Sequence, residues 1–327
     1  VSVMTVSNFV NGKFGMMGEK TRGKIQAVLE EMPYRPHSSA RNLRLSRYFS
    51  VGQVVVDESP FFMTRRVIGS IMAGLAQELN GNGYSLTVQR VPGKADADVA
   101  PVLRNQLTDG LCVMLSGSYQ QQEALLDFFC SLGQPLVLLQ KALPSPREDV
   151  CVVRMNERNG GVILAELLVS KGAKRLLMMT SAVAWPSLDE RVSGVQEVVL
   201  GSGGGVVLEL LPVPESSPDV RRCIDEYLDA VPLPDAIIAA NDQIALIAME
   251  RIRARGLRLP GDIMLAAFEA HDPWNYVDSV CTTIRLPAFE LGMAAGTALL
   301  ERFRSGAFAE SDIVLPVTLC EHSGTTG

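Results

Sequence analysis

Polar and charged side chains stand directly at the ends of several apolar, β-branched runs of this sequence. They are Asp57, Ser116, Gln140, Asn241, Asp242 and Glu269. Carboxylates, amides and hydroxyls can hold a small polar ligand by hydrogen bonds. Arg191 adds a planar fork of donors, which complements the acceptor-only carboxylate of Glu269. This set of residues predicts the binding of a ligand that carries both donors and acceptors.

Sequence signatures of catalysis are absent. No GxSxG, HExxH, Walker or kinase pattern occurs, and the chain has three histidines. Its six cysteines lie far apart and form no CxxC, so a zinc site is not expected. The GSGGG at 201–205 follows a helical pattern and precedes a strand, the reverse of a phosphate-binding loop. We therefore expect no enzyme activity, no metal and no cofactor.

The elements that must position these residues alternate between strands and helices. Predicted strands cover 51–57, 84–91, 110–116, 135–140, 150–155, 175–181, 206–213, 236–242, 263–269 and 281–286. Predicted helices cover 64–80, 98–108, 120–132, 157–171, 188–200, 218–229, 242–255 and 288–304. Continuous apolar strands separated by helices indicate parallel sheets covered on both faces. This length of α/β pattern is too much for one sheet, so we predict two doubly wound parallel-sheet subdomains.

Residues 1–50 have a different charge from the rest of the chain. They carry eight Lys/Arg against three acidic residues, whereas the whole chain has a net charge of −6. A basic head on an acidic body indicates a polyanion partner for the head, although a solvated basic face would look the same. No apolar stretch is long enough to cross a membrane. Scattered cysteines inside apolar runs favour reduced thiols and the cytoplasm.

Several motifs resemble one known family. VSxxTVSxxxNG at the start is followed by TRGKIQAVLEEMPYRPHSSARNLR, and the later stretches are NERNGGVILAELL, DERVSGV, PDAIIAANDQIALIAMERI and CTTIRLPAFELG. Together they resemble the lactose/galactose-repressor family of bacterial transcription regulators over nearly the whole chain. In that family the first motif is the recognition helix of a helix-turn-helix, and a hinge helix and a ligand-sensing core follow.

The resemblance implies a domain organisation. Residues 1–37 correspond to a partial helix-turn-helix head, 38–50 to a hinge helix and linker, and 51–327 to an effector-binding and dimerisation core with the architecture of periplasmic binding proteins. Within the core we expect an N-subdomain at about 51–154 plus 286–307 and a C-subdomain at about 155–285 plus 308–327. The family's first helix would precede Val1, so we expect this chain to bind DNA weakly and without sequence preference.

The resemblance also implies DNA-contacting residues. They are Val3, Met4, Thr5, Ser7, Asn8, Asn11, Thr21, Arg22, Arg41, Leu43 and Arg44. Val3 and Met4 match the positions that read base edges, and Asn8, where the family usually has Arg, is able to pair with adenine. Leu43 matches the hinge leucine that wedges into the minor groove, with packing against the core as its alternative.

For the effector, the resemblance singles out residues at strand ends. They are Asp57, Phe61, Phe62, Ser116, Gln140, Trp185, Ser187, Arg191, Asn241, Asp242 and Glu269. Arg191 matches the ligand-binding arginine of the RxxG motif, and Glu269 stands where the family has Asp. Phe62 has plain core packing as its alternative, Asp242 the capping of the following helix, and Trp185 a surface anchor.

These expectations combine into an effector-responsive transcriptional regulator, most simply a repressor. It would act as a homodimer on operator DNA and sense a sugar or sugar acid, with no membrane association. The rival is a stand-alone solute-binding receptor of the periplasmic sugar-binding type. Such a receptor has no need of the basic segment SSARNLRLSR.

Overall fold

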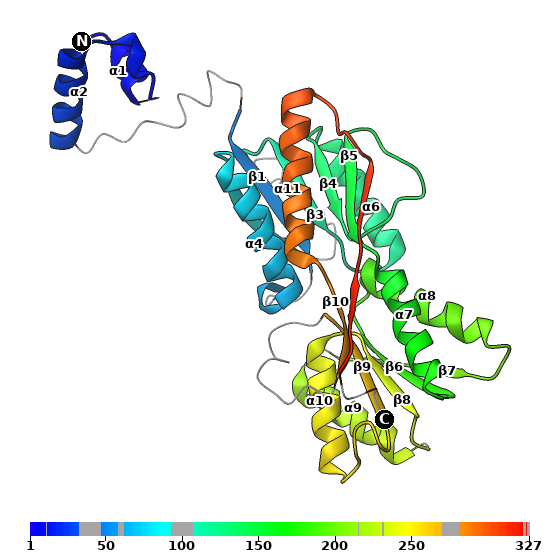
Figure 1. Ribbon diagram of the computed structural model, residues 1–327. Helices are drawn as coiled ribbons and strands as arrows, with labels where there is room; N and C mark the ends of the chain where they lie inside the picture. The colour runs from blue at the N-terminus through cyan, green and yellow to red at the C-terminus, as the bar shows by residue number, and fades with distance from the viewer. Residues whose placement is uncertain are drawn as a thin grey trace. The chain divides into compact units, whose positions relative to one another are not determined.

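The computed structural model describes residues 1–10, 12–32, 47–57, 62–92, 107–214, 216–230, 232–269, 281–322 and 325. The chain divides into two compact units, Val1–Tyr48 and Phe49–Gly327. Figure 1 shows the second unit as two mostly parallel sheets with helices on their faces, which confirms the predicted fold class.

The first unit holds two short helices, α1 (Val3–Val10) and α2 (Glu19–Glu31), with a 3₁₀ turn between them. Among its described residues only Ile25 is buried. The rings of Phe9 and Phe14 meet edge to face with centroids 5.5 Å apart, and the Arg22 guanidinium lies 4.1 Å from the Phe14 centroid. Such a small interior gives these helices little tertiary stabilisation.

The first sheet of the second unit has the strand order β11-β5-β4-β3-β1-β2, and the pairings of its strands are parallel. Its strands are β1 (Ser50–Val56), β2 (Ser85–Val91), β3 (Gly110–Met114), β4 (Leu136–Leu139), β5 (Val150–Met155) and β11 (Asp312–Leu315). Its helices are α4 (Arg66–Gly81), α6 (Tyr119–Ser131) and α11 (Ala288–Ser305). Every residue of β1 is buried, because Val51 and Val55 pack on one face and Val54 and Val56 on the other.

The second sheet has the order β12-β10-β9-β8-β6-β7, with β12 antiparallel to β10. Its strands are β6 (Arg175–Ser181), β7 (Val207–Val213), β8 (Ala236–Ala239), β9 (Met264–Glu269), β10 (Thr282–Arg285) and β12 (Thr318–Cys320). Its helices are α7 (Glu157–Ser170), α8 (Pro186–Gly201), α9 (Ser217–Ala230) and α10 (Asp242–Ala254). The GSGGG segment joins α8 to β7 as a turn, as predicted.

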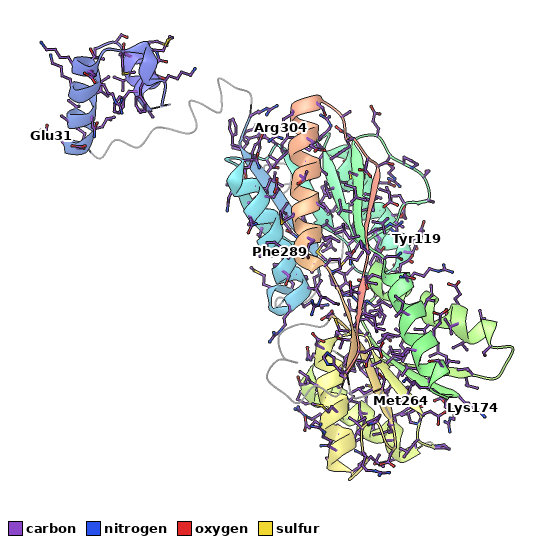
Figure 2. The ribbon with its side chains drawn as sticks, in the orientation of Figure 1. Glu31, Tyr119, Lys174, Met264, Phe289 and Arg304 are labelled. Atoms are coloured by element: carbon purple, nitrogen blue, oxygen red, sulfur yellow. The ribbon has the colours of Figure 1, made fainter. Side chains whose placement is uncertain are left out.

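The chain passes between the two sheets three times, from β5 to α7, from β10 to α11 and from β11 to β12. The connection from β10 to α11 can be followed in Figure 2 between two labelled residues, Met264 in the second sheet and Phe289 on α11 beside the first sheet. The expectation that all of 308–327 belongs to the C-subdomain is wrong. β11 pairs with β5 in the first sheet, and the Arg154 guanidinium holds Asp312 there at 2.9 Å.

Two bulk expectations concern membranes and thiols. Within the described ranges, no helix is long and apolar enough to span a bilayer. All six cysteines are free thiols, and Cys112, Cys151 and Cys281 are buried. Burial raises the pKa of the Cys151 thiol to about 12, with a smaller contribution from the charge of Asp312. The three buried thiols therefore behave as small core side chains.

Candidate functional site

A cavity of about 760 Å³ lies between the two sheets of the second unit. The first sheet contributes Met114, Leu139 and Gln140, and the second contributes Ala240 and Glu269. These residues stand at or just beyond the carboxyl ends of parallel strands, the usual position of ligand sites in doubly wound folds. The volume is in the range of pockets that enclose small molecules.

Arg191 is the charged centre of this cavity. Its Nε and Nη2 donate to the two carboxylate oxygens of Glu157 at 2.8 and 3.0 Å, and its Nη1 donates to the carbonyl of Ala240. A Glu269 oxygen lies 4.0 Å from Nη1, and the guanidinium covers the Phe268 ring at 4.7 Å. Burial by itself would lower the pKa of Arg191, but the charges of Glu157, Glu269 and Asp242 hold that pKa above its ordinary value.

Glu157 was missed by the sequence reasoning. It is 2% exposed and begins α7, directly after β5 and Asn156. Gln140 Nε2 donates to its Oε1 at 3.1 Å, and Gln140 Oε1 accepts from the amide of Met155 at 2.7 Å. The available signal lay in the motif NERNGG at 156–161, whose second residue is Glu157 where the family that the sequence resembles has Asn. A continuous set of hydrogen bonds therefore runs from β4 through Glu157 to Arg191 on α8.

Two glycines bring α7 and α8 close enough for this pair to form. A Cβ on Gly161 would stand 2.3 Å from the carbonyl oxygen of Arg191, and one on Gly194 would stand 2.0 Å from that of Arg158. Real Cβ atoms do not approach backbone oxygens so closely, so both positions need glycine. The glycine of the RxxG motif thus sets the distance between Arg191 and the helix that carries Glu157.

Backbone strain also collects at the cavity. Gln140 has φ +63° and Glu269 has φ +102°, a region that side chains other than glycine rarely adopt. Each such conformation costs on the order of 1–3 kcal/mol and persists where the surrounding structure holds it. Strained residues that carry polar side chains into one cavity indicate a functional site.

Seven of the predicted effector residues line the cavity: Gln140, Trp185, Ser187, Arg191, Asn241, Asp242 and Glu269. Asn241 Oδ1 accepts from the amide of Ile244 at 2.8 Å, so Asn241, and not Asp242, is the N-cap of α10. Trp185 is half-buried, and its Nε1 finds no hydrogen-bond acceptor in the described part of the chain. Trp185 is therefore a cavity wall and not a surface anchor.

Three further predicted residues, Phe62, Ser116 and Asp57, are described and do not line the cavity. Phe62 is 7% exposed and belongs to the core. The Ser116 hydroxyl donates to the Val56 carbonyl at 2.6 Å, which orients it into the first sheet. Asp57 forms an ion pair at 3.3 Å with Arg65, and it is Arg65 that reaches the cavity. Phe61 lies outside the described residues.

Sequence reasoning also missed cavity-lining residues at the start of α4, at the end of β6, before α9 and on α10. They include Arg65, Arg66, Ser181, Ser216 and Gln243. The Arg65 guanidinium lies 5.1 Å from the Trp185 ring, which places a cation against an aromatic wall. Arg65 directly precedes α4, and only its folded position distinguishes it from a surface arginine.

In the first unit, α1 presents the predicted base-reading side chains to solvent. Val3 is 88% exposed and Met4 is 62% exposed, and none of the residues of α1 is buried. Thr5, Ser7 and Asn8 on α1 and Thr21 on α2 are half-buried, and Arg22 on α2 is exposed. The other predicted contacts, Asn11, Arg41, Leu43 and Arg44, lie outside the described residues.

Comparison with known proteins gives a consistent picture. A family described as a periplasmic binding protein-like domain matches residues 165–325. The HTH-type transcriptional repressor PurR of Aliivibrio fischeri is 27% identical over 310 residues, which cover 93% of this chain and 89% of that protein. The ribose operon repressor of Haemophilus influenzae is 25% identical, with the same coverage of each.

Solved structures agree on the fold. A lac repressor dimer bound to operator and the anti-inducer ONPF superposes with a TM-score of 0.85 at 22% identity, covering 100% of this chain and 96% of that one. A transcriptional regulator from Enterococcus faecium with bound ribose gives a TM-score of 0.69 at 20% identity, covering 83% and 97%. At identities of 20–22%, these superpositions show that this chain has the same fold as the two solved structures, and they show nothing beyond the fold.

Proposed function

We propose that this chain is an effector-responsive, DNA-binding repressor of the lactose/galactose-repressor family of bacterial transcription regulators, which its similarity to curated repressors supports. One observation carries the proposal. The similarity to curated repressors covers 93% of the chain, and this share cannot be reached within Phe49–Gly327 alone. The likeness therefore includes the basic head as well as the unit with the cavity.

The effector occupies the cavity between the two sheets. Arg191 and Glu269 supply donors and acceptors there, and Trp185 and the aliphatic side chains around it supply apolar surface. A polyhydroxyl compound matches such a lining, because sugars combine hydroxyls with C–H faces that pack on aromatic rings. The relatives named for ribose support a sugar or sugar acid as the class of effector.

The head contacts operator DNA. Val3, Met4 and Asn8 face base edges, and Thr5, Ser7, Thr21 and Arg22 contact phosphates. Asn11, Arg41, Leu43 and Arg44 complete the contacts by family resemblance. Two copies bind a palindromic operator as a homodimer, since half-site symmetry follows protein symmetry. Effector binding changes DNA affinity only as far as its affinity differs between the two conformations of the sensing unit.

The alternative is a solute-binding receptor without a DNA partner. The match of residues 165–325 to a periplasmic binding protein-like domain favours it as the second candidate. The two candidates differ in whether the protein is found on chromosomal DNA.

Chromatin immunoprecipitation of the protein, expressed from its own gene in the bacterium that encodes it, tests the proposal. A repressor gives a small number of enriched sites that share a palindrome of one or two helical turns. Recovery of the protein from a periplasmic extract, with no enriched chromosomal site, would establish the receptor instead.

A further inference from the structure

The positive charge of Arg191 is already matched inside the protein. The guanidinium shares two hydrogen bonds with the Glu157 carboxylate at 2.8 and 3.0 Å, and both side chains are at least nine-tenths buried. A bidentate pair of this geometry is the strong form of the arginine–carboxylate interaction. An anionic ligand at this arginine would have to compete with Glu157.

We infer that the cavity selects an uncharged polyhydroxyl effector, and that Glu157 is the residue that rejects its acid counterpart. The inference rests on the proposed function in that it treats this cavity as the effector site. It narrows the proposed class of effector from sugars and sugar acids to neutral sugars.

Glu157 is held too firmly to swing away from an arriving anion. Gln140 donates to its Oε1 at 3.1 Å, and the carboxylate stands in the first turn of α7, where the helix dipole favours negative charge. A displaced Glu157 would be a buried carboxylate without its cation, which is strongly unfavourable. An anionic ligand that replaced Glu157 at Arg191 would form a similar ion pair, and it would not offset the cost of leaving Glu157 unpaired.

The group that faces an arriving ligand is the carboxylate of Glu269. Its side chain is 19% exposed, compared with 7% for that of Arg191, and it lies 4.0 Å from Nη1. A carboxylate accepts hydrogen bonds from sugar hydroxyls and repels a second carboxylate. The partly open side of this charged centre is therefore suited to hydroxyl donors.

The charge balance of the cavity supports the same conclusion. Among the described residues, the cationic side chains of the lining are Arg65, Arg66 and Arg191. The lining has two carboxylates, those of Asp242 and Glu269. Two more, those of Asp57 and Glu157, form ion pairs with Arg65 and Arg191. Within the part of the chain that the structure describes, three positive charges against four negative ones leave no surplus of positive charge that would attract an anion.

Matched sugar pairs test the inference on the full chain. D-galactose with D-galacturonate, and D-glucose with D-glucuronate, differ only in whether carbon 6 carries an alcohol or a carboxylate. Thermal unfolding and calorimetry give the affinity for each member at constant ionic strength. We expect the neutral member of a bound pair to bind at least about tenfold more tightly, because Glu157 already occupies the Arg191 fork and a like charge at Glu269 adds repulsion. Tighter binding of either acid would overturn the inference.

Glu157→Gln removes the negative charge but keeps an oxygen that accepts from Arg191. This variant should bind the acid member more tightly by about tenfold or more, and acetate should raise its melting temperature above a chloride control. The matched control is Glu197→Gln, which removes an exposed glutamate paired with Arg158 at 3.0 Å. The control should behave like the wild type.

Each remaining outcome decides the question. If no sugar binds the wild type, the acetate response alone is the criterion, and its absence in Glu157→Gln overturns the inference. If Glu157→Gln does not fold, Glu157→Asp replaces it: this variant keeps the charge but draws it back from the Arg191 fork by one methylene, so it should narrow the preference for the neutral sugar, and an unchanged preference overturns the inference. Chromatin profiling tests the proposed function without any ligand, so a protein that finds no operator but follows this charge rule would refute only the proposed function.

Discussion

Replacement of Gly194 by alanine tests whether the approach of α8 to α7 holds the site together. The added Cβ would stand 2.0 Å from the carbonyl oxygen of Arg158 and 2.9 Å from the amide nitrogen of Val162. Because Cβ contacts below 3.0 Å essentially never occur, the two helices must separate by about 1 Å. A gap of that size forfeits roughly a quarter to a half of the dispersion energy of the atoms involved.

The magnitude follows from two opposing effects. Overpacking against backbone, which has no rotamer to adjust, belongs at the upper end of the usual range, about 3 kcal/mol. Alanine recovers about 1 kcal/mol of helix propensity. Gly194→Ala should therefore lower the free energy of unfolding by about 2 kcal/mol. It should also weaken effector binding, because Arg191 lies one turn earlier on α8 and pairs across the contact with Glu157.

Gly201→Ala is the matched control. Gly201 is the last residue of the same helix, and a Cβ there meets no atom within 4 Å. It should leave stability unchanged or raise it by up to about 1 kcal/mol. Urea unfolding followed by tryptophan fluorescence measures both variants, with unchanged m-values as the check on comparability. If the two variants differed by less than about 0.5 kcal/mol, within ordinary surface effects, the close helix contact would not be what places Arg191.

Three further outcomes are expected. Arg191→Ala should abolish the rise in melting temperature that the effector produces. It should also destabilise the chain by about 3–5 kcal/mol, because it leaves the Glu157 carboxylate buried without its cation. Wild-type stability of this variant in calorimetry would contradict the ion pair. A hydrogen bond from Arg251, with a smaller contribution from Arg255, holds the pKa of the Asp225 carboxyl below its ordinary value. The stability they add is present above pH about 4 and is lost as the pH falls through the lowered pKa, so the urea midpoints of wild type and Asp225→Asn should converge in acid. Iodoacetamide at pH 8 should leave Cys151 unmodified until the protein is unfolded, and labelling of the native state would argue against its burial.

The order of strands and helices was predictable from sequence because the central parallel strands, such as β1, β3, β4 and β8, are buried on both faces. The run at 150–155 and the helical pattern at 157–171 lie within one residue of β5 and α7 as observed. Burial on both faces demands apolar residues throughout a strand, and this demand leaves a continuous signal. β11 gave no such signal, since it is four residues long and half-exposed, and its partner β5 is distant in the chain.

The candidate site was also predictable only in part from the sequence. The sequence by itself determined which side chains end the strands and which match the family's motifs, and so it identified Arg191, Asn241 and Glu269. Only the tertiary structure decided that Arg191 is neutralised by Glu157, 34 residues away in the chain. The physical reason is that this ion pair depends on how closely α7 and α8 approach. That distance is set by glycines on both helices, which have a meaning only when the facing backbone is in place.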